Sequence, residues 1–308
     1  MRRLTSCFIA LLLFVALSTH SLAQVGEIGK IDWIRGHIVG YGFGTAQPGL
    51  NKSIARITSI RAAKVDAMRN LLEVVKGVDI DSYTKVQDFV IQSDSVSARV
   101  SGVIKGAYVL NEETAWEGDI PVSKITMGIC INSDGEKCSP GTSLVSALDL
   151  SNFKNALKIP EKEYSLPADA PSSPEPASVQ AIPEDFDYQY NSVKPTSGVV
   201  LRLMGYYFKK VVLPVVTTRS NGEIETVYSV NRVEPRIVRT YGIVRYADKL
   251  SQIKEIDKVG SNFIIVPIHS VTDDNMIVIG SDGARKIYET TRHGNDYLKE
   301  AKVVICYE

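Results

Sequence analysis

Few side chains in this sequence combine the residue type and the spacing that catalysis requires. The histidines that follow the first twenty-five residues are His37, His269 and His293, and none has a second ligand or catalytic partner at a useful spacing. Asp79 and Asp81 alternate within an expected strand and form a candidate carboxylate pair, the arrangement that glycoside hydrolases use. An alternating strand also places both carboxylates toward solvent, and His269 lies inside a strand-like run. We therefore expect neither group to be catalytic.

Sequence motifs for known reactions are also missing. The chain contains no G-x-S-x-G, no H-E-x-x-H and no P-loop. The stretch Gly40-Tyr41-Gly42-Phe43-Gly44 lies between an expected strand and a helix, but its spacing is not the G-x-G-x-x-G of dinucleotide loops. Its glycines are more typical of a strand with a bulge or a close backbone contact. Asp273-Asp274 could help to bind a cation, and a turn explains the same residues. The sequence thus predicts a protein that is not an enzyme and uses no cofactor.

The cysteines suggest an oxidising compartment. Cys130 and Cys138 flank the turn-like stretch INSDGEK and could close a short loop as a disulfide, and the spacing leaves the free state equally open. Cys306, in the apolar run VVICY, is expected to be a buried free thiol. We expect no zinc site, because no second close pair of cysteines or histidines accompanies these residues.

Exposed aromatic residues would be the signature of a sugar or peptide site. The candidates are Trp33, Trp116, Tyr206 and Tyr207. Partial burial in a core is the default interpretation of each of them. They keep a glycan- or peptide-binding module open as the alternative function.

A long helix over residues 51–76 should organise the first domain. Asn51 is a good N-cap, and Gly77 can close the helix. Apolar residues at three- and four-residue spacing predict a wide buried face in two rows, Ile57, Arg61, Val65, Met68, Leu72 and Val75 beside Ile60, Ala63, Ala67, Leu71 and Val74. The small residues Ala62, Ala63 and Ala67 would allow a sheet to approach closely.

The other segments predict two α+β domains. Around the helix we expect strands over 31–45, 78–86, 107–110 and 121–131 and a helix capped by Ser93, which gives the order β-α-β-α-β-β over residues 24–135, with helices on one face of a mostly antiparallel sheet. Residues 136–195 read as a linker with one short helix over 142–158 and then a Pro-rich disordered stretch. Residues 196–308 are strand-rich, with short helices near 248–257 and 282–288 and turns at Asn221-Gly222 and Asp273-Asp274-Asn275.

The start of the chain predicts export. Residues 1–23 have the basic, apolar and small-residue regions of a signal peptide, and the apolar stretch is too short to span a bilayer. Cys7 precedes this stretch, so we expect no lipid on it. Lysine plus arginine and aspartate plus glutamate number 35 each, which gives no electrostatic case for nucleic acid. The predicted location is the periplasm or the exterior, in association with the outer membrane or free.

Several stretches of the first domain resemble a known family. Arg61 to Glu73 (RAAKVDAMRNLLE), Gly77-Val78 and Gly102 to Ala107 (GVIKGA) resemble the Lpp-twenty lipoprotein family over about residues 31–131. That family includes the flagellar outer-membrane protein FlgP, and its domain is similar to the N-terminal domain of the flagellar protein FlgT. GIVRY at 242–246 and LKEAKVVI at 298–305 resemble a companion domain of uncharacterised exported bacterial proteins. The resemblance implies a non-catalytic component of the cell envelope, with protein partners there and self-association into rings or discs around a flagellum or another trans-envelope machine.

Overall fold

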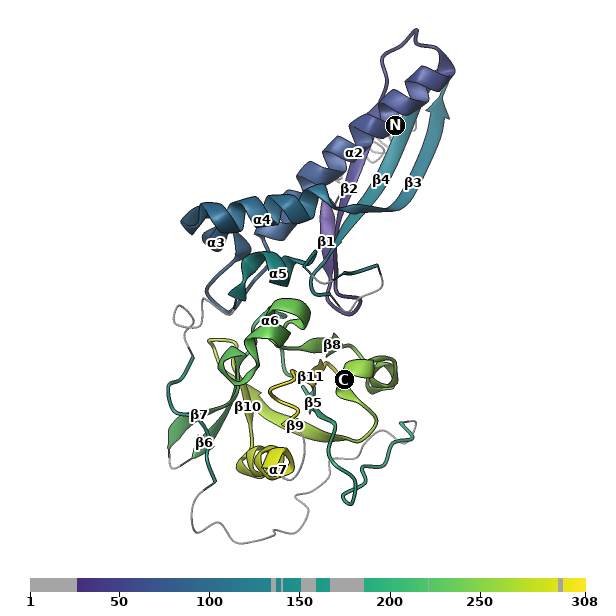
Figure 1. Ribbon diagram of the computed structural model, residues 1–308. Helices are drawn as coiled ribbons and strands as arrows, with labels where there is room; N and C mark the ends of the chain where they lie inside the picture. Colours follow the sequence, from purple (N-terminus) through teal and green to yellow (C-terminus); the bar gives the residue numbers. More distant parts are fainter. Residues whose placement is uncertain are drawn as a thin grey trace, which may run out of the picture.

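The chain forms two domains that each contain helices and a sheet, as the predicted α+β class requires (Figure 1). The computed structural model describes residues 27–133, 137–139, 141–150, 159–166, 186–220, 222–292 and 296–308. The predicted signal peptide, Cys7 and most of the Pro-rich stretch lie outside the described residues. Within those residues, no helix has the length and apolar content needed to span a bilayer.

The first domain is a four-stranded antiparallel sheet with a long helix on one face. The sheet order is β1-β2-β4-β3, and α2 packs along β2 and β4 (Figure 1). The elements are β1 (Gly29–Asp32), β2 (His37–Thr45), α2 (Lys52–Lys76), α3 (Val86–Gln92), α4 (Asp94–Lys105), β3 (Tyr108–Glu117) and β4 (Ile120–Cys130). As predicted, Asn51 caps α2 by accepting a hydrogen bond from the Ser53 amide, and the Ser93 hydroxyl accepts one from the Val96 amide at the start of α4.

A row of glycines lets α2 lie directly on the sheet. Gly40, Gly42 and Gly44 alternate along β2 and face the helix. A Cβ atom on Gly42 would lie 2.2 Å from the carbonyl oxygen of Ala63 and 2.2 Å from the amide nitrogen of Ala67. The prediction that these glycines permit close backbone packing is therefore confirmed.

This close contact decides which side of α2 is buried. The buried residues are mostly small, namely Ala55, Ser59, Ala63, Ala67, Leu71 and Val75. The predicted burial of Ile57 and Val65 is wrong, because their side chains are 52% and 61% exposed. Branched side chains of this size do not fit between a helix and a strand whose backbones touch, so they lie on the outer side of α2.

Three segments of the first domain differ from the expected order. Residues 31–45, expected as one strand, contain the end of β1, a turn over 33–36 and β2, and the two strands pair as a hairpin. Residues 78–86 form no strand but a turn, in which a carboxylate oxygen of Asp81 accepts hydrogen bonds from the amides of Tyr83 and Thr84, both at 2.8 Å. Residues 111–119, expected to be a connection, belong mostly to the ten-residue strand β3. A two-residue turn at Gly118 and Asp119 joins β3 to β4 as a hairpin.

The second domain contains a mixed seven-stranded sheet in the order β7-β6-β10-β9-β5-β11-β8. The successive pairs β9/β5, β5/β11 and β11/β8, which end at the edge strand β8, are parallel, and so is β10/β6. The pairs β10/β9 and β6/β7 are antiparallel. The strands are β5 (Gly198–Arg202), β6 (Val216–Ser220), β7 (Glu223–Tyr228), β8 (Arg245–Ala247), β9 (Phe263–Val271), β10 (Ile277–Ile279) and β11 (Val303–Cys306). The helices are η3 (Val230–Arg232), α6 (Pro235–Tyr241), η4 (Leu250–Glu255), η5 (Asp257–Val259) and α7 (Ser281–Arg292).

Both faces of this sheet are covered. Val199 and Leu201 of β5 belong to one apolar cluster with Ala284 of α7, and the intervening Val200 belongs to another with Leu250 of η4. This alternation is the period of a strand that is buried on both sides. The predicted turns are confirmed at Gly222 between β6 and β7 and at residues 272–276 between β9 and β10.

The two domains share one apolar core. Within the predicted linker helix over 142–158, α5 (Leu144–Leu148) packs between α4 and α6, and residues 151–158 lie outside the described residues. The amides of Val212 and Leu213 donate hydrogen bonds to the carbonyl oxygens of Asp79 and Ile80, across the boundary between the domains. Figure 1 shows the consequence: α2, β2, β4 and β3 rise away from this junction as an extension of the first domain, which we call the arm.

Candidate functional site: the exposed surfaces of the arm

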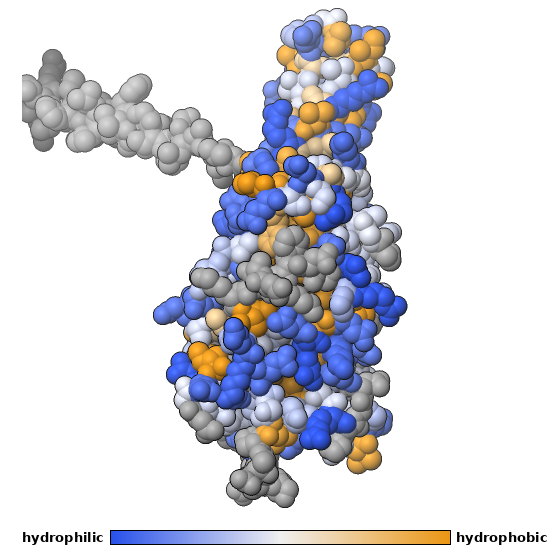
Figure 2. All heavy atoms as spheres, turned by 60° about the vertical axis from the view of Figure 1, so that its left-hand side comes forward, coloured by the Kyte–Doolittle hydropathy of each residue, from blue (hydrophilic) through white to orange (hydrophobic). Residues whose placement is uncertain are grey.

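The outer face of α2 is both apolar and basic. It includes the exposed residues Lys52, Ile54, Arg56, Ile57, Arg61, Val65 and Arg69, and Glu73 near the end of the helix is exposed as well. The carboxylate of Asp66 lies beside this face and accepts a hydrogen bond from the Phe43 amide at 3.0 Å, so it is tied to β2. In Figure 2, orange apolar patches alternate with blue hydrophilic residues along the arm. Exposed aliphatic groups among cations are typical of a surface that contacts another molecule.

The opposite charge lies on the outermost strand of the same sheet. β3 pairs with β4 along one side, and no described strand pairs with its other side. The sequence of β3, YVLNEETAWE, contains glutamates and no lysine or arginine. We call this strand, with Asp119 in the following turn, the acidic edge. Its exposed large apolar residues are Val109, Leu110 and Trp116.

Two ion pairs within the arm already join lysines of α2 to carboxylates of the acidic edge. Lys52 lies 3.7 Å from Asp119, and Lys64 lies 3.7 Å from Glu112. Such exposed pairs contribute little to stability, because solvent and salt screen them. Arg56, Arg61 and Arg69 on one side, and Glu113 and Glu117 on the other, remain exposed.

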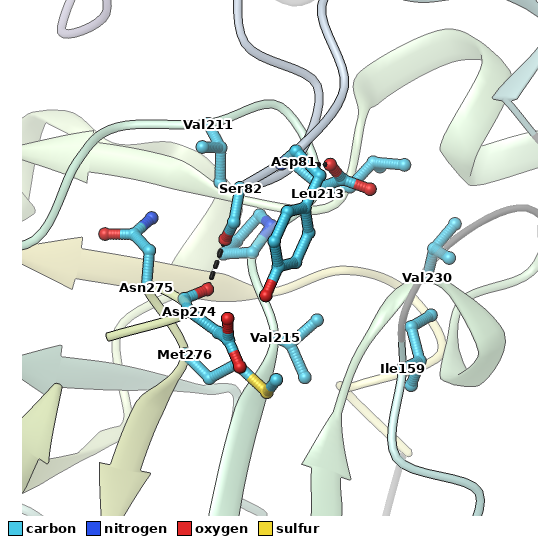
Figure 3. A pocket seen from close by; sticks show the side chains of 12 residues that line it. Asp81, Ser82, Ile159, Val211, Leu213, Val215, Val230, Asp274, Asn275 and Met276 are labelled. Atoms are coloured by element: carbon cyan, nitrogen blue, oxygen red, sulfur yellow. Dashed lines mark hydrogen bonds between the residues drawn. The ribbon is translucent and has the colours of Figure 1, made fainter. Parts of the chain in front are cut away.

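The candidate carboxylates Asp79 and Asp81 have separate partners. One carboxylate oxygen of Asp79 lies 2.7 Å from the ammonium of Lys209, and Asp81 caps its own turn. Asp81 and Ser82 border a cavity of only about 20 Å³, shown in Figure 3, and no histidine is among its described lining residues. The Ser82 hydroxyl donates to the carbonyl oxygen of Asp274. These contacts hold the two domains together.

The histidines and aromatic residues are also kept apart. His269 is exposed on β9, and His293 lies outside the described residues. Trp33 packs edge-on against Tyr246 at the domain junction, whereas Trp116 lies at the far end of the arm. The nine-residue strand β2 runs along the arm between the positions of these two tryptophans. At about 3.4 Å per residue, its length is roughly 27 Å. A shared aromatic site formed by both is therefore excluded.

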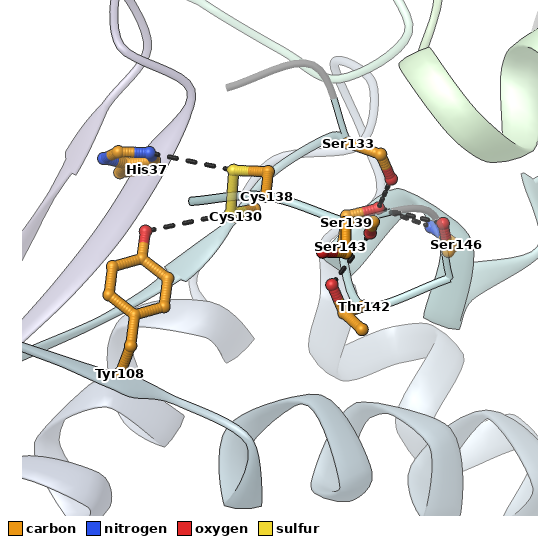
Figure 4. Close-up of a disulfide and its surroundings, with 9 residues drawn as sticks. All are labelled: His37, Tyr108, Cys130, Ser133, Cys138, Ser139, Thr142, Ser143 and Ser146. Carbon is orange, nitrogen blue, oxygen red and sulfur yellow. Dashed lines mark hydrogen bonds between the residues drawn. A yellow bond between two sulfur atoms is a disulfide. The ribbon is translucent and has the colours of Figure 1, made fainter. Parts of the chain in front are cut away.

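Cys130 and Cys138 are joined in a disulfide at the base of the arm (Figure 4). The Nε2 atom of His37 lies 3.8 Å from the Cys138 sulfur, and the Tyr108 hydroxyl lies 3.7 Å from the Cys130 sulfur. The side chains of His37, Cys130 and Cys138 offer ligand atoms within 4.8 Å of one another. Metal binding requires thiolates, and the disulfide consumes both sulfurs. Cys306 is a buried free cysteine, as predicted.

Sequence reasoning missed both surfaces of the arm. The sequence pattern places Ile57, Arg61 and Val65 of the outer face in the core and Lys52 and Arg56 toward water. It predicts a connection over residues 111–119, where most of β3 forms. A signal for β3 was present, since Gly118-Asp119 is a two-residue hairpin turn between two segments that contain apolar residues.

The fold and these surfaces define a two-domain α+β protein with a charged, partly apolar arm. Residues 198–308, a little more than a third of the chain, match the family model described as the second domain of Treponema pallidum Tp0624. The comparison with curated proteins gave no match. The matched segment is the second domain, so the arm lies outside it.

Proposed function

We propose that this chain is an exported, non-catalytic structural component of the bacterial cell envelope that assembles with further copies of itself through the arm. The observation that carries the proposal is that the arm presents two complementary surfaces. The outer face of α2 is basic and the edge strand β3 is acidic, and each exposes large apolar residues.

Two different surfaces that complement each other give a head-to-tail contact. Such a contact closes into a ring or continues as a filament, depending on the rotation between neighbours. Charge complementarity would set the register of neighbouring arms. Burial of the remaining exposed surface of Ile54 and Ile57, which are 55% and 52% exposed, would add roughly 1 kcal/mol each. The glutamates of β3 otherwise oppose pairing with another acidic edge, which favours the basic surface as its partner.

The resemblance of the first domain to the Lpp-twenty family agrees with this function. It suggests the envelope as the location and a flagellum or another trans-envelope machine as the setting. The alternative, a periplasmic glycan- or peptide-binding module, would use a concave site lined by aromatic residues. Trp33 and Trp116 do not share such a site, so this alternative has less support.

A charge-swap experiment tests the assembly. We expect the mature protein to form oligomers in sedimentation velocity and light scattering, and Arg61→Glu and Glu113→Arg each to weaken them. A mixture of the two variants should regain association, because each supplies the surface that the other lost. Arg239→Glu, on α6 outside the arm, is the matched control and should assemble normally.

Two results would reject the assembly. One is a monomer at high protein concentration and low salt, and the other is loss of association in both single variants with no recovery on mixing. Deletion of the gene, scored for motility and envelope integrity, tests the cellular role separately, and normal scores in both assays would contradict it.

A further inference from the structure

Three side chains that can each bind a metal ion converge at the base of the arm (Figure 4). They are His37 of β2, Cys130 at the end of β4, and Cys138 in the segment that follows β4. Their ligand atoms, one nitrogen and two sulfurs, lie within 4.8 Å of one another. In the oxidised chain the two sulfurs are bonded to each other, so they become available as metal ligands only when the disulfide is reduced. The spacing of the cysteines alone could not indicate this group, because His37 joins them from a distant strand.

Strand pairing holds two of these ligands together without the disulfide. His37 and Cys130 are directly opposite each other in the antiparallel pair of β2 and β4. Opposite residues of such a pair project from the same face of the sheet, with Cβ atoms about 4.5–5.5 Å apart. The pairing continues beyond Cys130, where the Ile131 amide donates a hydrogen bond to the carbonyl oxygen of Gly36 at 2.7 Å. These backbone bonds involve no sulfur, so they should keep His37 and Cys130 in place when the disulfide opens.

A second set of contacts keeps Cys138 near these two residues. The amide and the hydroxyl of Thr142 both donate hydrogen bonds to the carbonyl oxygen of Ser139, at 3.1 Å and 2.8 Å. Ser143 then pairs with Cys130 as an isolated bridge. Cys138 therefore directly precedes a turn that is fixed to the end of β4 by its own hydrogen bonds.

The distances within the group are close to those of a tetrahedral zinc site. With Zn–S bonds of about 2.3 Å and Zn–N bonds of about 2.0–2.1 Å, a bound nitrogen and sulfur lie about 3.5 Å apart and two bound sulfurs about 3.8 Å apart. The Nε2 atom of His37 already lies 3.8 Å from the Cys138 sulfur. Once the bond between the sulfurs is broken, rotation of either cysteine side chain about χ1 can separate them without moving the backbone.

We propose that reduction of this disulfide creates a zinc site formed by His37, Cys130 and Cys138. A dithiol reductant supplies two electrons and two protons, so the bond between the sulfurs breaks, two thiols form, and the dithiol itself becomes a disulfide. Zinc then replaces both thiol protons, which pass to solvent, and neutral His37 provides the lone pair of Nε2. Water occupies the fourth position of the tetrahedron.

The surroundings suit this state of the site. Two thiolates balance the charge of Zn²⁺, and a neutral site is compatible with a buried Cys130 and a partly buried His37 and Cys138. The Tyr108 hydroxyl, 3.7 Å from the Cys130 sulfur, is placed to donate a hydrogen bond to the thiolate. The disulfide and the metal would fasten the same segment to β4, so oxidation and zinc binding exclude each other. This site does not depend on the proposed assembly of the arm.

Metal titration of the mature full-length protein in its two redox states tests the proposal. The reductant is a water-soluble phosphine, which reduces disulfides without offering a thiolate ligand. Under anaerobic conditions the reduced protein should bind one Co²⁺ per chain with the absorption of a tetrahedral cobalt–thiolate site, and Zn²⁺ should displace it. The oxidised protein should show no such absorption. Equal binding by both forms, or no cobalt–thiolate absorption in the reduced form, would overturn the proposal. If reduction unfolds the first domain, zinc should restore its circular dichroism, and failure to do so would overturn the proposal equally.

Substitutions assign the metal to these residues. His37→Gln should weaken zinc binding by the reduced protein about tenfold or more, because one of three protein ligands is lost. His269→Gln, at an exposed position on β9, is the matched control and should bind zinc normally. Cys306→Ala should also leave the cobalt–thiolate absorption unchanged, since that thiol is not part of the group.

The melting temperature separates metal binding from a structural role of His37. Zinc should raise the melting temperature of the reduced unaltered protein and leave that of reduced His37→Gln nearly unchanged. A histidine that only packs against its neighbours would shift both melting temperatures without changing their response to zinc. If His37→Gln and His269→Gln bind zinc with equal affinity, or if Cys306→Ala abolishes the absorption, the assignment is wrong.

Discussion

Replacing Gly42 by alanine should be one of the most damaging single-methyl additions in the described part of the chain. In an open strand the same change would be mildly favourable, because alanine restricts the unfolded chain more than glycine does. Here the added Cβ atom would lie 2.2 Å from two backbone atoms of α2, the Ala63 oxygen and the Ala67 nitrogen. Neither atom can rotate away as the end of a side chain can.

The size of the effect follows from the displacement that α2 must make. Non-bonded contacts are most favourable near 3.5 Å, so the helix must retreat from β2 by about 1 Å. A gap of that size removes about a quarter to a half of the dispersion attraction between the layers, and overpacking of this kind costs about 1–3 kcal/mol. Because backbone opposes backbone, we expect about 3 kcal/mol, which corresponds to a decrease of roughly 6–12 °C in melting temperature.

Thermal and urea unfolding followed by circular dichroism measure this loss. Gly102→Ala is the matched control, since Gly102 lies within α4 and a Cβ atom there meets nothing within 4 Å. That substitution should stabilise the protein by about 0.5–1 kcal/mol, because glycine is a poor helix former. If Gly42→Ala unfolds at the same urea concentration as the unaltered protein, the backbone contact between α2 and β2 does not exist.

Three further predictions follow from burial, chain connectivity and titration. In urea unfolding, Leu71→Ala should lower the free energy of unfolding by about 2–5 kcal/mol and Val65→Ala by less than about 0.5 kcal/mol. The reason is that the Leu71 side chain is fully buried whereas Val65 is 61% exposed. Equal losses would contradict the orientation of α2. Cys138→Ser should lower stability by about 2.5 kcal/mol, the entropy of closing a loop with a sequence separation of 8, and identical melting of the oxidised and reduced protein would argue against the bond. Burial raises the pKa values of Tyr228 and Tyr246 well above their ordinary value. The unfolded chain therefore loses these protons first, and the free energy of unfolding should fall as the pH rises above about 10. A free energy of unfolding that stays constant from about pH 8 to 11 would contradict this.

The parts of the fold that depend on local signals could be predicted from the sequence. Asn51 and Gly77 mark the ends of α2, and Ser93 marks the start of α4, because each cap acts on residues within one turn of itself. The turn before β7 could be predicted for the same reason. The alternating segment 78–86 predicts a strand that does not form. Its backbone pairs with residues 212 and 213 of the other domain, a contact that no local pattern reveals.

The candidate sites depend on contacts between distant segments, and the sequence could not reveal them. Asn132, Arg236, Arg245 and Lys258 share one cavity in the seam between the two domains, yet they come from segments separated by up to 126 residues. Of these residues, only Arg245 belongs to a stretch with a family resemblance, GIVRY at 242–246. The cavity follows from the docking of the two domains, so the fold is needed to find it.

The interaction surface proposed for the arm and the packing of its core have the same physical cause. The glycines of β2 bring the sheet so close to α2 that the centre of its buried face must be alanine or serine. A helix with a small-residue core face buries little apolar area along that stretch, and its larger aliphatic residues, Ile54, Ile57 and Val65, are left on the outside. Since leaving such residues in water is unfavourable, the arm has a thermodynamic reason to acquire a covering partner. A glycine-rich strand beside an alanine-rich helix therefore predicts an exposed aliphatic stripe on the opposite side of that helix, and the acidic edge of a second copy is the covering surface that the charges favour.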